Sequence, residues 1–179
     1  MDDVSDPGRP QRVLADPPTP DDQDAYKLLS TFAAKGVGVV TARQERWDHA
    51  VTVTDFLSVS YEPPTLVVSL HALSRIAEAV IATGRFALSI LADDQRFVAD
   101  RLGEPGSPLV GLLDHVPHER RDPDGPALLD ESLTWFELEL QAVHEVATHV
   151  LVVGTVTAMS AQPAWAARPL VRWRSQYQR

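Results

Sequence analysis

The hydrophobic positions of this chain fall mainly into short β-branched runs, which predict strands rather than long helices. The run 36–42 (GVGVVTA) is apolar and β-branched, and it is typical of a buried strand. Further strands are expected at 49–60, 65–70 and 86–91, and a last one near 170–177. We therefore expect a mainly β protein.

Alternation of apolar and polar residues identifies an exposed strand and a hairpin. Segment 49–60 (HAVTVTDFLSVS) alternates, and its parity assigns to one face Val51, Val53 and Asp55, and to the other Thr52, Thr54 and Phe56. The direction of the Asp55 side chain stays open. Segments 133–143 and 149–158 are expected to pair as a hairpin with one wet face, which carries Glu137, Glu139 and Gln141.

Three short helices are expected around these strands. Aspartates at 21–22 can cap a first helix through residue 34, and aspartates at 93–94 can cap a third through residue 102. A second helix begins at Ser74 and ends at Gly84. Its apolar residues at helical spacing are Leu73, Ile76, Ala77, Val80 and Ile81.

The number of strands decides the architecture. Six or seven strands with few helices indicate a closed antiparallel barrel, and helices alternate with strands too rarely for a doubly wound sheet. The length of 179 residues fits one domain, which we assign to 21–179. Residues 1–20 hold five prolines among scattered aspartates, and we expect a disordered tail that folding does not require. A Gly- and Pro-rich stretch at 103–127 predicts a long loop.

Composition narrows the partners. A formal net charge of -9 argues against a broad basic surface for nucleic acid or an anionic membrane, but not against one local basic pocket. The absence of cysteine excludes disulfides, thiolate catalysis and cysteine-ligated metals. No apolar run reaches the roughly 18 residues of a membrane span, and the N-terminus MDDVSDPGRP is acidic, unlike a signal peptide. We expect a cytoplasmic protein with no nucleic-acid or membrane partner.

Motifs for several other chemistries are incomplete. Gly36 and Gly38 begin like a dinucleotide fingerprint, but the third glycine is missing and the pair lies inside a predicted strand. His115 and His118 lack a third ligand at good spacing, so no metal site is expected. Neither a GxxxxGK[ST] phosphate loop nor a GxSxG nucleophile elbow is present.

Hydroxyl side chains give the strongest functional signal. They cluster around two predicted strands and a helix start, at Thr52, Thr54, Ser58, Ser60, Ser69 and Ser74. Ser74 and Arg75 open the second helix, where free backbone N–H groups, a hydroxyl and a guanidinium could bind a phosphate. A capping serine beside a solvated arginine explains the same two residues equally well.

Five stretches follow one another in a characteristic order and spacing: 32–41 (FAAKGVGVVT), 52–64 (TVTDFLSVSYEPP), Ser74-Arg75 with 84–91 (GRFALSIL), 125–130 (GPALLD) and 149–156 (HVLVVGTV). Together they resemble the flavin reductase-like domain family, especially the short reductase components of two-component monooxygenases. The resemblance extends from about Tyr26 to Tyr177. It implies an FMN-binding split β-barrel of Greek-key type with a few short peripheral helices.

The resemblance also implies an activity and a site. Family members form homodimers, bind FMN or FAD near the interface, reduce it with NADH or NADPH, and release it to a partner monooxygenase by diffusion. By position, the isoalloxazine and ribityl chain would be lined by Thr52, Val53, Thr54 and Asp55, and the phosphate side by Ser69, Leu70, Ser74 and Arg75. His149 matches a histidine that the family places near the nicotinamide.

Three positions depart from the family pattern. Asp55 stands where relatives usually carry serine, Ala147-Thr148 replaces a Gly-Asp pair, and residues 46–49 (RWDH) replace a glycine turn. An ionised carboxylate can only accept hydrogen bonds. It would repel a phosphate 4 Å away by roughly 4 kcal/mol at a surface-like dielectric, unless Arg75 or another basic group pairs with it.

Two hypotheses follow for the function. The first is an NAD(P)H:flavin oxidoreductase, in which the flavin carries the chemistry and no side chain must act as general acid or base. The second is a split barrel that has lost redox turnover and binds or cyclises a hydrophobic small molecule in secondary metabolism. The visible spectrum of the purified protein separates the two.

Overall fold

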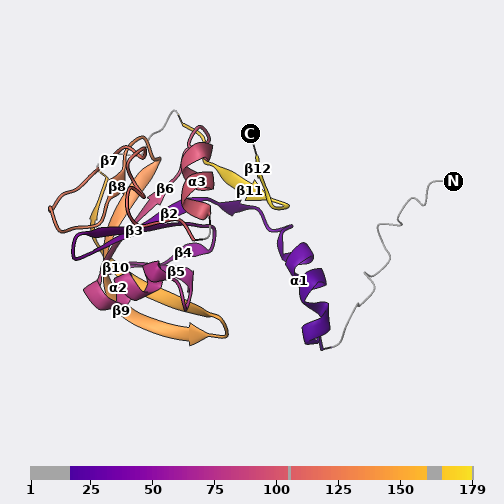
Figure 1. Ribbon diagram of the computed structural model, residues 1–179. Coiled ribbons are helices and arrows are strands. Elements are labelled where there is room, and N and C mark those ends of the chain that lie inside the picture. Colours follow the sequence, from indigo (N-terminus) through magenta and orange to yellow (C-terminus); the bar gives the residue numbers. More distant parts are fainter. Residues whose placement is uncertain (1–16, 105, 161–166, 179) are drawn as a thin grey trace.

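Seven antiparallel strands form the main sheet of the computed structural model, which describes residues 17–104, 106–160 and 167–178 (Figure 1). The order along the sheet is β3-β2-β6-β9-β10-β5-β4. The strands are β2 (Gly38–Gln44), β3 (Trp47–Val53), β4 (Phe56–Tyr61), β5 (Pro64–His71), β6 (Arg85–Ile90), β9 (Thr134–Val146) and β10 (His149–Met159). Most of the expected tail, residues 1–16, lies outside the described residues, and its disorder stays a prediction.

One short connection brings the two edges of this sheet together. β3 and β4 lie at opposite ends of the sheet order, yet only Thr54 and Asp55 separate them along the chain. The three Cα–Cα steps from Val53 to Phe56 span at most about 11 Å, so the sheet must curl until its edges approach. The Ser69 N–H donates to the Asp55 carbonyl at 2.9 Å and ties the connection to β5. The mainly β barrel predicted from the sequence is confirmed.

The prediction of a single strand over 49–60 is wrong. The segment contributes the end of β3 and most of β4, which lie on opposite edges of the sheet. The two-residue connection shifts the parity, because Val53 and Phe56 are three positions apart and both pack in the barrel core. Phe56 was expected on the face of Thr52, but it packs against the barrel core.

Short helices lie at the periphery, as expected: η1 (Pro20–Asp22), α1 (Gln23–Ser30), α2 (Arg75–Thr83) and α3 (Arg96–Gly103). α2 starts and stops where the sequence indicates. The Ser74 hydroxyl accepts a hydrogen bond from the Ala77 N–H at 3.3 Å, and Gly84 ends the helix with φ of 70°. That left-handed conformation favours glycine. None of the described helices is long and apolar enough to cross a membrane.

The apolar face of α2 is narrower than predicted. Ile76, Ala77 and Val80 are buried against the barrel. Leu73 precedes the helix and is 91% exposed, and Ile81 is half exposed. The helical spacing is correct only for the residues that pack against the barrel, whereas Leu73 and Ile81 lie on the exposed side.

α3 begins later than aspartate capping predicts. Its N-cap is Gln95, and neither Asp93 nor Asp94 holds that position. The buried Gln95 side chain accepts a hydrogen bond from the Ala92 N–H at 3.1 Å and donates to the Asp130 carbonyl at 2.9 Å. A long-range contact therefore fixes the start of this helix.

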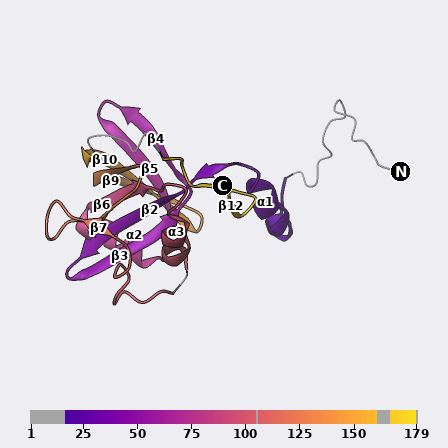
Figure 2. The same cartoon turned by 90° about the horizontal axis from the view of Figure 1, so that it is seen from above.

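α1 extends away from the barrel toward the C-terminal strands (Figures 1 and 2). Asp22 holds the N-cap position, as predicted, but its carboxylate accepts from Thr19 and makes no hydrogen bond to the helix. The helix ends at Ser30 rather than near residue 34, and none of its residues is buried. The Trp173 indole N–H donates to the Phe32 carbonyl at 3.1 Å, and the Arg174 N–H donates to the Thr31 carbonyl at 2.8 Å. These bonds hold the end of the helix against the C-terminal turn.

Small sheets complete the described structure. β1 (Lys35–Gly36) pairs with β11 (Val171–Trp173), which pairs with β12 (Gln176–Gln178). The single last strand predicted near 170–177 is therefore wrong, because the chain reverses at 174–175, where both residues have positive φ. The long loop predicted at 103–127 is present, but it holds β7 (His118–Glu119), which pairs with β8 (Leu128–Leu129).

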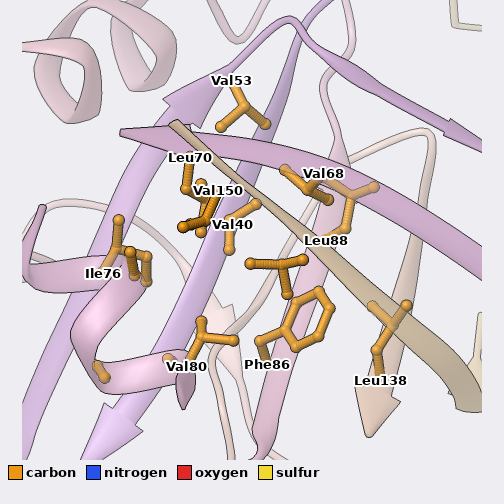
Figure 3. Close-up of a cluster of buried hydrophobic side chains, with 14 of the residues drawn as sticks. Val40, Val53, Val68, Leu70, Ile76, Val80, Phe86, Leu88, Leu138 and Val150 are labelled. Carbon is orange, nitrogen blue, oxygen red and sulfur yellow. The ribbon is translucent and has the colours of Figure 1, made fainter. Parts of the chain in front are cut away.

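Two hydrophobic clusters fill the protein on either side of β2. The first lies between the barrel strands and α2, with Val40, Val68, Phe86, Leu88 and Leu138 at its centre (Figure 3). The second lies under α3 and the long loop, and includes Val39, Ala99, Leu102, Leu113 and Leu129. Successive residues of β2 enter different clusters, which explains why its sequence is apolar at nearly every position.

β9 and β10 pair as a hairpin, as expected. The prediction that Glu137 lies on a solvent-exposed face is wrong. Glu137 is 5% exposed. Its carboxylate accepts hydrogen bonds from Arg85 at 3.1 Å and Arg121 at 2.9 Å. Two cations from distant segments compensate the buried charge, and alternation within one strand cannot predict that.

Candidate functional site

Three hollows lie next to β3 or to its connection with β4. The corner hollow, of about 540 Å³, is lined by Lys35, Thr54, Asp55, Ser69 and Leu151, among others. The hairpin hollow, of about 570 Å³, is lined by Thr52, Thr54, Arg96, Arg172 and Tyr177, among others. The α2 hollow, of about 610 Å³, is lined by His49, His71, Ser74, Arg75 and Gly103, among others. Thr54 is shared by the first two, and Gly103 also lines the hairpin hollow.

The predicted flavin-binding residues divide into two groups. Those whose side chains line a hollow are Thr52, Thr54, Asp55, Ser69, Ser74 and Arg75. Val53 and Leu70 have buried side chains within the barrel core. These two can offer only backbone groups to a ligand.

The hydroxyls of β3 are partly occupied by the protein itself. The Thr52 hydroxyl donates to the Ala99 carbonyl at 2.8 Å, which fastens α3 to β3. The Thr54 hydroxyl donates to the Asp55 carboxylate at 3.4 Å. Thr54 therefore keeps the more accessible hydroxyl at the junction of two hollows.

The charge of Asp55 is compensated. The Lys35 ammonium lies 2.5 Å from its carboxylate, and both side chains line the corner hollow. The partner is thus a lysine of β1 rather than Arg75. The side chains remain 35% and 58% exposed, so solvent screens the pair and its contribution to stability is small. Its effect on a ligand in the hollow is larger, because it removes a net negative charge.

Ser74 and Arg75 both open α2, as predicted, and both have protein partners. The Ser74 hydroxyl donates to the His71 carbonyl at 2.7 Å while it caps the helix. The Arg75 guanidinium donates to the Ser107 carbonyl. A carbonyl does not neutralise the arginine, so the helix N-terminus and a full positive charge both face the α2 hollow.

His149 lies at the end of β10, directly opposite His71 of β5. The two rings meet edge to face at 5.5 Å between centroids, and the Thr148 hydroxyl lies 3.0 Å from Nδ1 of His149. His149 shares a face of β10 with Leu151, which lines the corner hollow. The exposed imidazole itself lines neither hollow, but its neighbours line both: His71 lines the α2 hollow and Leu151 the corner hollow.

His49 belongs to the site although no role was predicted for it. It is 7% exposed and lines the α2 hollow with Arg75. Burial first, and the positive charge of Arg75 second, hold the pKa of His49 below its usual value. The signal was present in the sequence, because His49 shares its parity with Val51 and Val53 and was bound to point inward.

The lowered pKa of His49 predicts a pH-dependent stability. Folding favours the neutral imidazole, so the unfolded chain binds more protons once the pH falls below its ordinary pKa of 6.5. Stability should be complete above this pH and decline below it, by up to about 1.4 kcal/mol per pH unit for one proton. Urea unfolding from pH 7.5 to 5 measures this decline. It should be shallower in His49→Gln, and an equal slope in both proteins would contradict the assignment.

Among the described residues, no group of three or more histidine and carboxylate side chains is placed to hold a metal. His118 is occupied otherwise. Its Nδ1 lies 2.7 Å from the Val116 carbonyl, and its Nε2 lies 3.4 Å from the Arg120 guanidinium.

A curled antiparallel sheet, with hydroxyl groups at its closing corner and an unneutralised arginine in the neighbouring α2 hollow, defines a split barrel. Residues 30–179 match the Flavin reductase like domain. The chain therefore belongs to this family, and its sequence-based assignment to the NAD(P)H:flavin oxidoreductases is confirmed.

Relatives and solved structures agree with this placement. NADH-dependent flavin reductase StyB of Pseudomonas fluorescens is 29% identical over 162 residues, 87% of this chain and 89% of StyB. HsaB of Mycobacterium tuberculosis, the reductase subunit of a flavin-dependent monooxygenase, is 28% identical over 84% of this chain and 78% of its own. A longer Rhizobium meliloti relative is 34% identical over 137 residues, and the match spans 42% of its length.

The fold has a close counterpart among solved structures. NADH:FAD oxidoreductase SgcE6 of Streptomyces globisporus superimposes with a TM-score of 0.82 at 22% identity. The match covers 95% of this chain and 98% of SgcE6. It shows that the two proteins share this fold.

Proposed function

We propose that this chain binds FMN or FAD along the corner and α2 hollows and reduces it with NADH or NADPH. One observation carries the proposal: Thr54 and Ser69 line one hollow, Ser74 and Arg75 line the other, and β5 runs between them. A bound flavin supplies the redox chemistry by accepting a hydride at its ring. The protein needs only to orient the two reactants and limit access of water.

The residues divide this work along the cleft. Lys35 and Asp55 form a neutral pair at the corner, where an uncharged ring can lie. Arg75 and the α2 N-terminus offer positive charge where a phosphate would end. An uncompensated Asp55 carboxylate would oppose flavin binding and would favour the alternative of a barrel without redox turnover. The ion pair with Lys35 compensates this charge.

The assay follows directly. Purified protein is titrated with FMN and FAD, and the oxidation of NADH and of NADPH is followed at 340 nm, roughly the absorption maximum of the reduced nicotinamide. Flavin binding with nicotinamide-dependent reduction supports the proposal. Flavin binding without reduction, or no binding, would refute it.

His149 is proposed to orient the hydride donor. Its exposed ring contacts His71, which lines the α2 hollow. His149→Ala should slow flavin reduction by NADH about tenfold, because an orienting contact is lost, with flavin affinity unchanged. Stopped-flow reduction and flavin titration measure the two quantities. His115→Ala, in the exposed long loop and not among the residues that line the corner or α2 hollow, is the control. A fall in flavin affinity instead would make His149 a flavin ligand.

A homodimer is proposed from the exposed face of α1. The side chains of Tyr26, Leu28, Leu29 and Phe32 are each more than half exposed. A second copy of the chain would cover them. Sedimentation at micromolar concentration should give a dimer, and Leu29→Glu should shift it toward monomer. Val110→Glu changes an equally exposed residue of the long loop and should have no effect. A monomeric wild type would exclude this interface.

A partner oxygenase and a cytoplasmic location are also proposed for this chain. HsaB is the reductase subunit of a flavin-dependent monooxygenase, which supports a partner oxygenase that receives reduced flavin by diffusion. A cytoplasmic location stays a prediction from the sequence.

A further inference from the structure

His49 forms part of the wall of the α2 hollow. Its neighbours there include Ser74 and Arg75 of α2, His71 at the end of β5, and Ser107 of the long loop. The His49 side chain is only 7% exposed, so the surrounding protein atoms restrict its orientation.

The ring is incompletely satisfied by the protein. Nδ1 of His49 is buried and has no hydrogen-bond partner among the described residues. Because the described protein offers Nδ1 neither a donor nor an acceptor, it does not fix which nitrogen of the neutral ring carries the proton. Because the ring also lines the hollow, Nε2 is the nitrogen that a bound ligand can reach.

The carboxylates near this histidine do not dominate its charge state. Asp48, its neighbour in β3, accepts hydrogen bonds from Arg43 at 3.1 Å and Arg120 at 2.7 Å. Glu78 of α2 and Asp48 favour the protonated ring, but burial and Arg75 outweigh them and lower the pKa. The other ionisable side chains of the hollow are His71 and Glu104.

Arg75 keeps its charge available. Its guanidinium donates to the Ser107 carbonyl, and in the described part of the chain no carboxylate lies within ion-pair distance of it. The α2 N-terminus adds a partial positive charge beside it. The hollow thus combines a cation, a helix terminus and a buried unpaired imidazole, which is a set suited to a dianion.

We propose that His49 determines the preference of this site for a terminal phosphate monoester, as in FMN, by donating a hydrogen bond to it and taking up a proton when it binds. This inference rests on the proposed flavin-binding function. A dianion placed against the imidazole would outweigh the effect of Arg75 and favour the charged ring. Binding of FMN would then be linked to proton uptake, and binding of riboflavin, which lacks the phosphate, would not.

The test compares FMN with riboflavin from pH 6.5 to 8, where the phosphate keeps most of its charge because its second pKa is about 6. In the wild-type protein, the Kd of FMN should fall by up to about tenfold per pH unit as the pH decreases. The Kd of riboflavin should stay level. In His49→Gln the pH dependence for FMN should vanish, and His115→Gln, in the exposed long loop, should behave like the wild type.

Proton uptake can also be measured without a variant. Calorimetric titration of wild-type protein with FMN, in two buffers of different ionisation enthalpy, should show uptake of a fraction of a proton, and riboflavin should show none. Absence of uptake, or an unchanged FMN slope in His49→Gln, overturns this inference while the flavin site stands. Failure of both flavins to bind overturns this inference together with the proposed function.

Discussion

Replacement of Gly154 by alanine is expected to lower the free energy of unfolding by about 2–3 kcal/mol. A Cβ at this position in β10 would lie 2.7 Å from Cζ and 2.8 Å from Cε1 of Phe86, and 3.0 Å from Cβ of Leu138. Both neighbours lie at the centre of the barrel core (Figure 3). Phe86 is fully buried and cannot rotate away without displacing other core side chains.

Urea unfolding of Gly154→Ala measures this cost. Gly36→Ala is the matched control, because its Cβ would meet only Cζ of Phe56, at an ordinary 3.6 Å. The control should change stability by less than about 1 kcal/mol. Equal effects from the two substitutions would show that the Phe86 contact does not limit the space at Gly154.

Lys35→Met is expected to weaken FMN binding about thirtyfold. Without its partner 2.5 Å away, the Asp55 carboxylate becomes an uncompensated charge in the corner hollow. For two unit charges at an assumed separation of roughly 8 Å and an effective dielectric of 20, the repulsion is about 2 kcal/mol, which corresponds to roughly thirtyfold in Kd. Fluorescence titration with FMN at low salt measures the change.

Two further variants test the cause. Asp55→Ser combined with Lys35→Met removes both charges and should restore affinity to within about threefold of the wild type. Lys27→Met, on the exposed helix α1, removes another ion-paired lysine outside the hollows and should have no effect. If Lys27→Met matches Lys35→Met, only net charge is being measured and the local pairing is irrelevant.

Much of the fold could be predicted because local patterns determine it. Short apolar runs locate β2, β5 and β6, and Ser74 and Gly84 mark the ends of α2. The barrel follows from the count of strands. Order and spacing of short stretches then give the family, which no single motif in this chain would reveal.

The predictions are wrong where contacts between distant residues, or turns with weak sequence signals, determine the structure. The C-terminal hairpin turns at Arg174 and Ser175, without the Asn-Gly or Gly-Gly pair that usually marks such a turn. Glu137 is buried because Arg85 and Arg121 reach it from other segments. These contacts depend on how strands are arranged, which alternation along one strand does not record.

The candidate site shows the same division. Parity predicts that His49 faces inward, and capping rules predict Ser74. The partner of Asp55 could not be predicted, because Lys35 lies 20 positions earlier and meets it only after β1 is added beside the barrel.

The two-residue connection between β3 and β4 couples the opening of the site to the opening of the whole barrel. Thr54 and Asp55 cannot move apart from the outer strands, since they are the only covalent link between those strands at the seam. Amide hydrogens of β3 and β4 should therefore exchange together, as one cooperative unit, rather than as two fraying edges. A flavin bound at this seam would hold β3 and β4 together. Its binding should therefore slow amide exchange in both strands to the same extent.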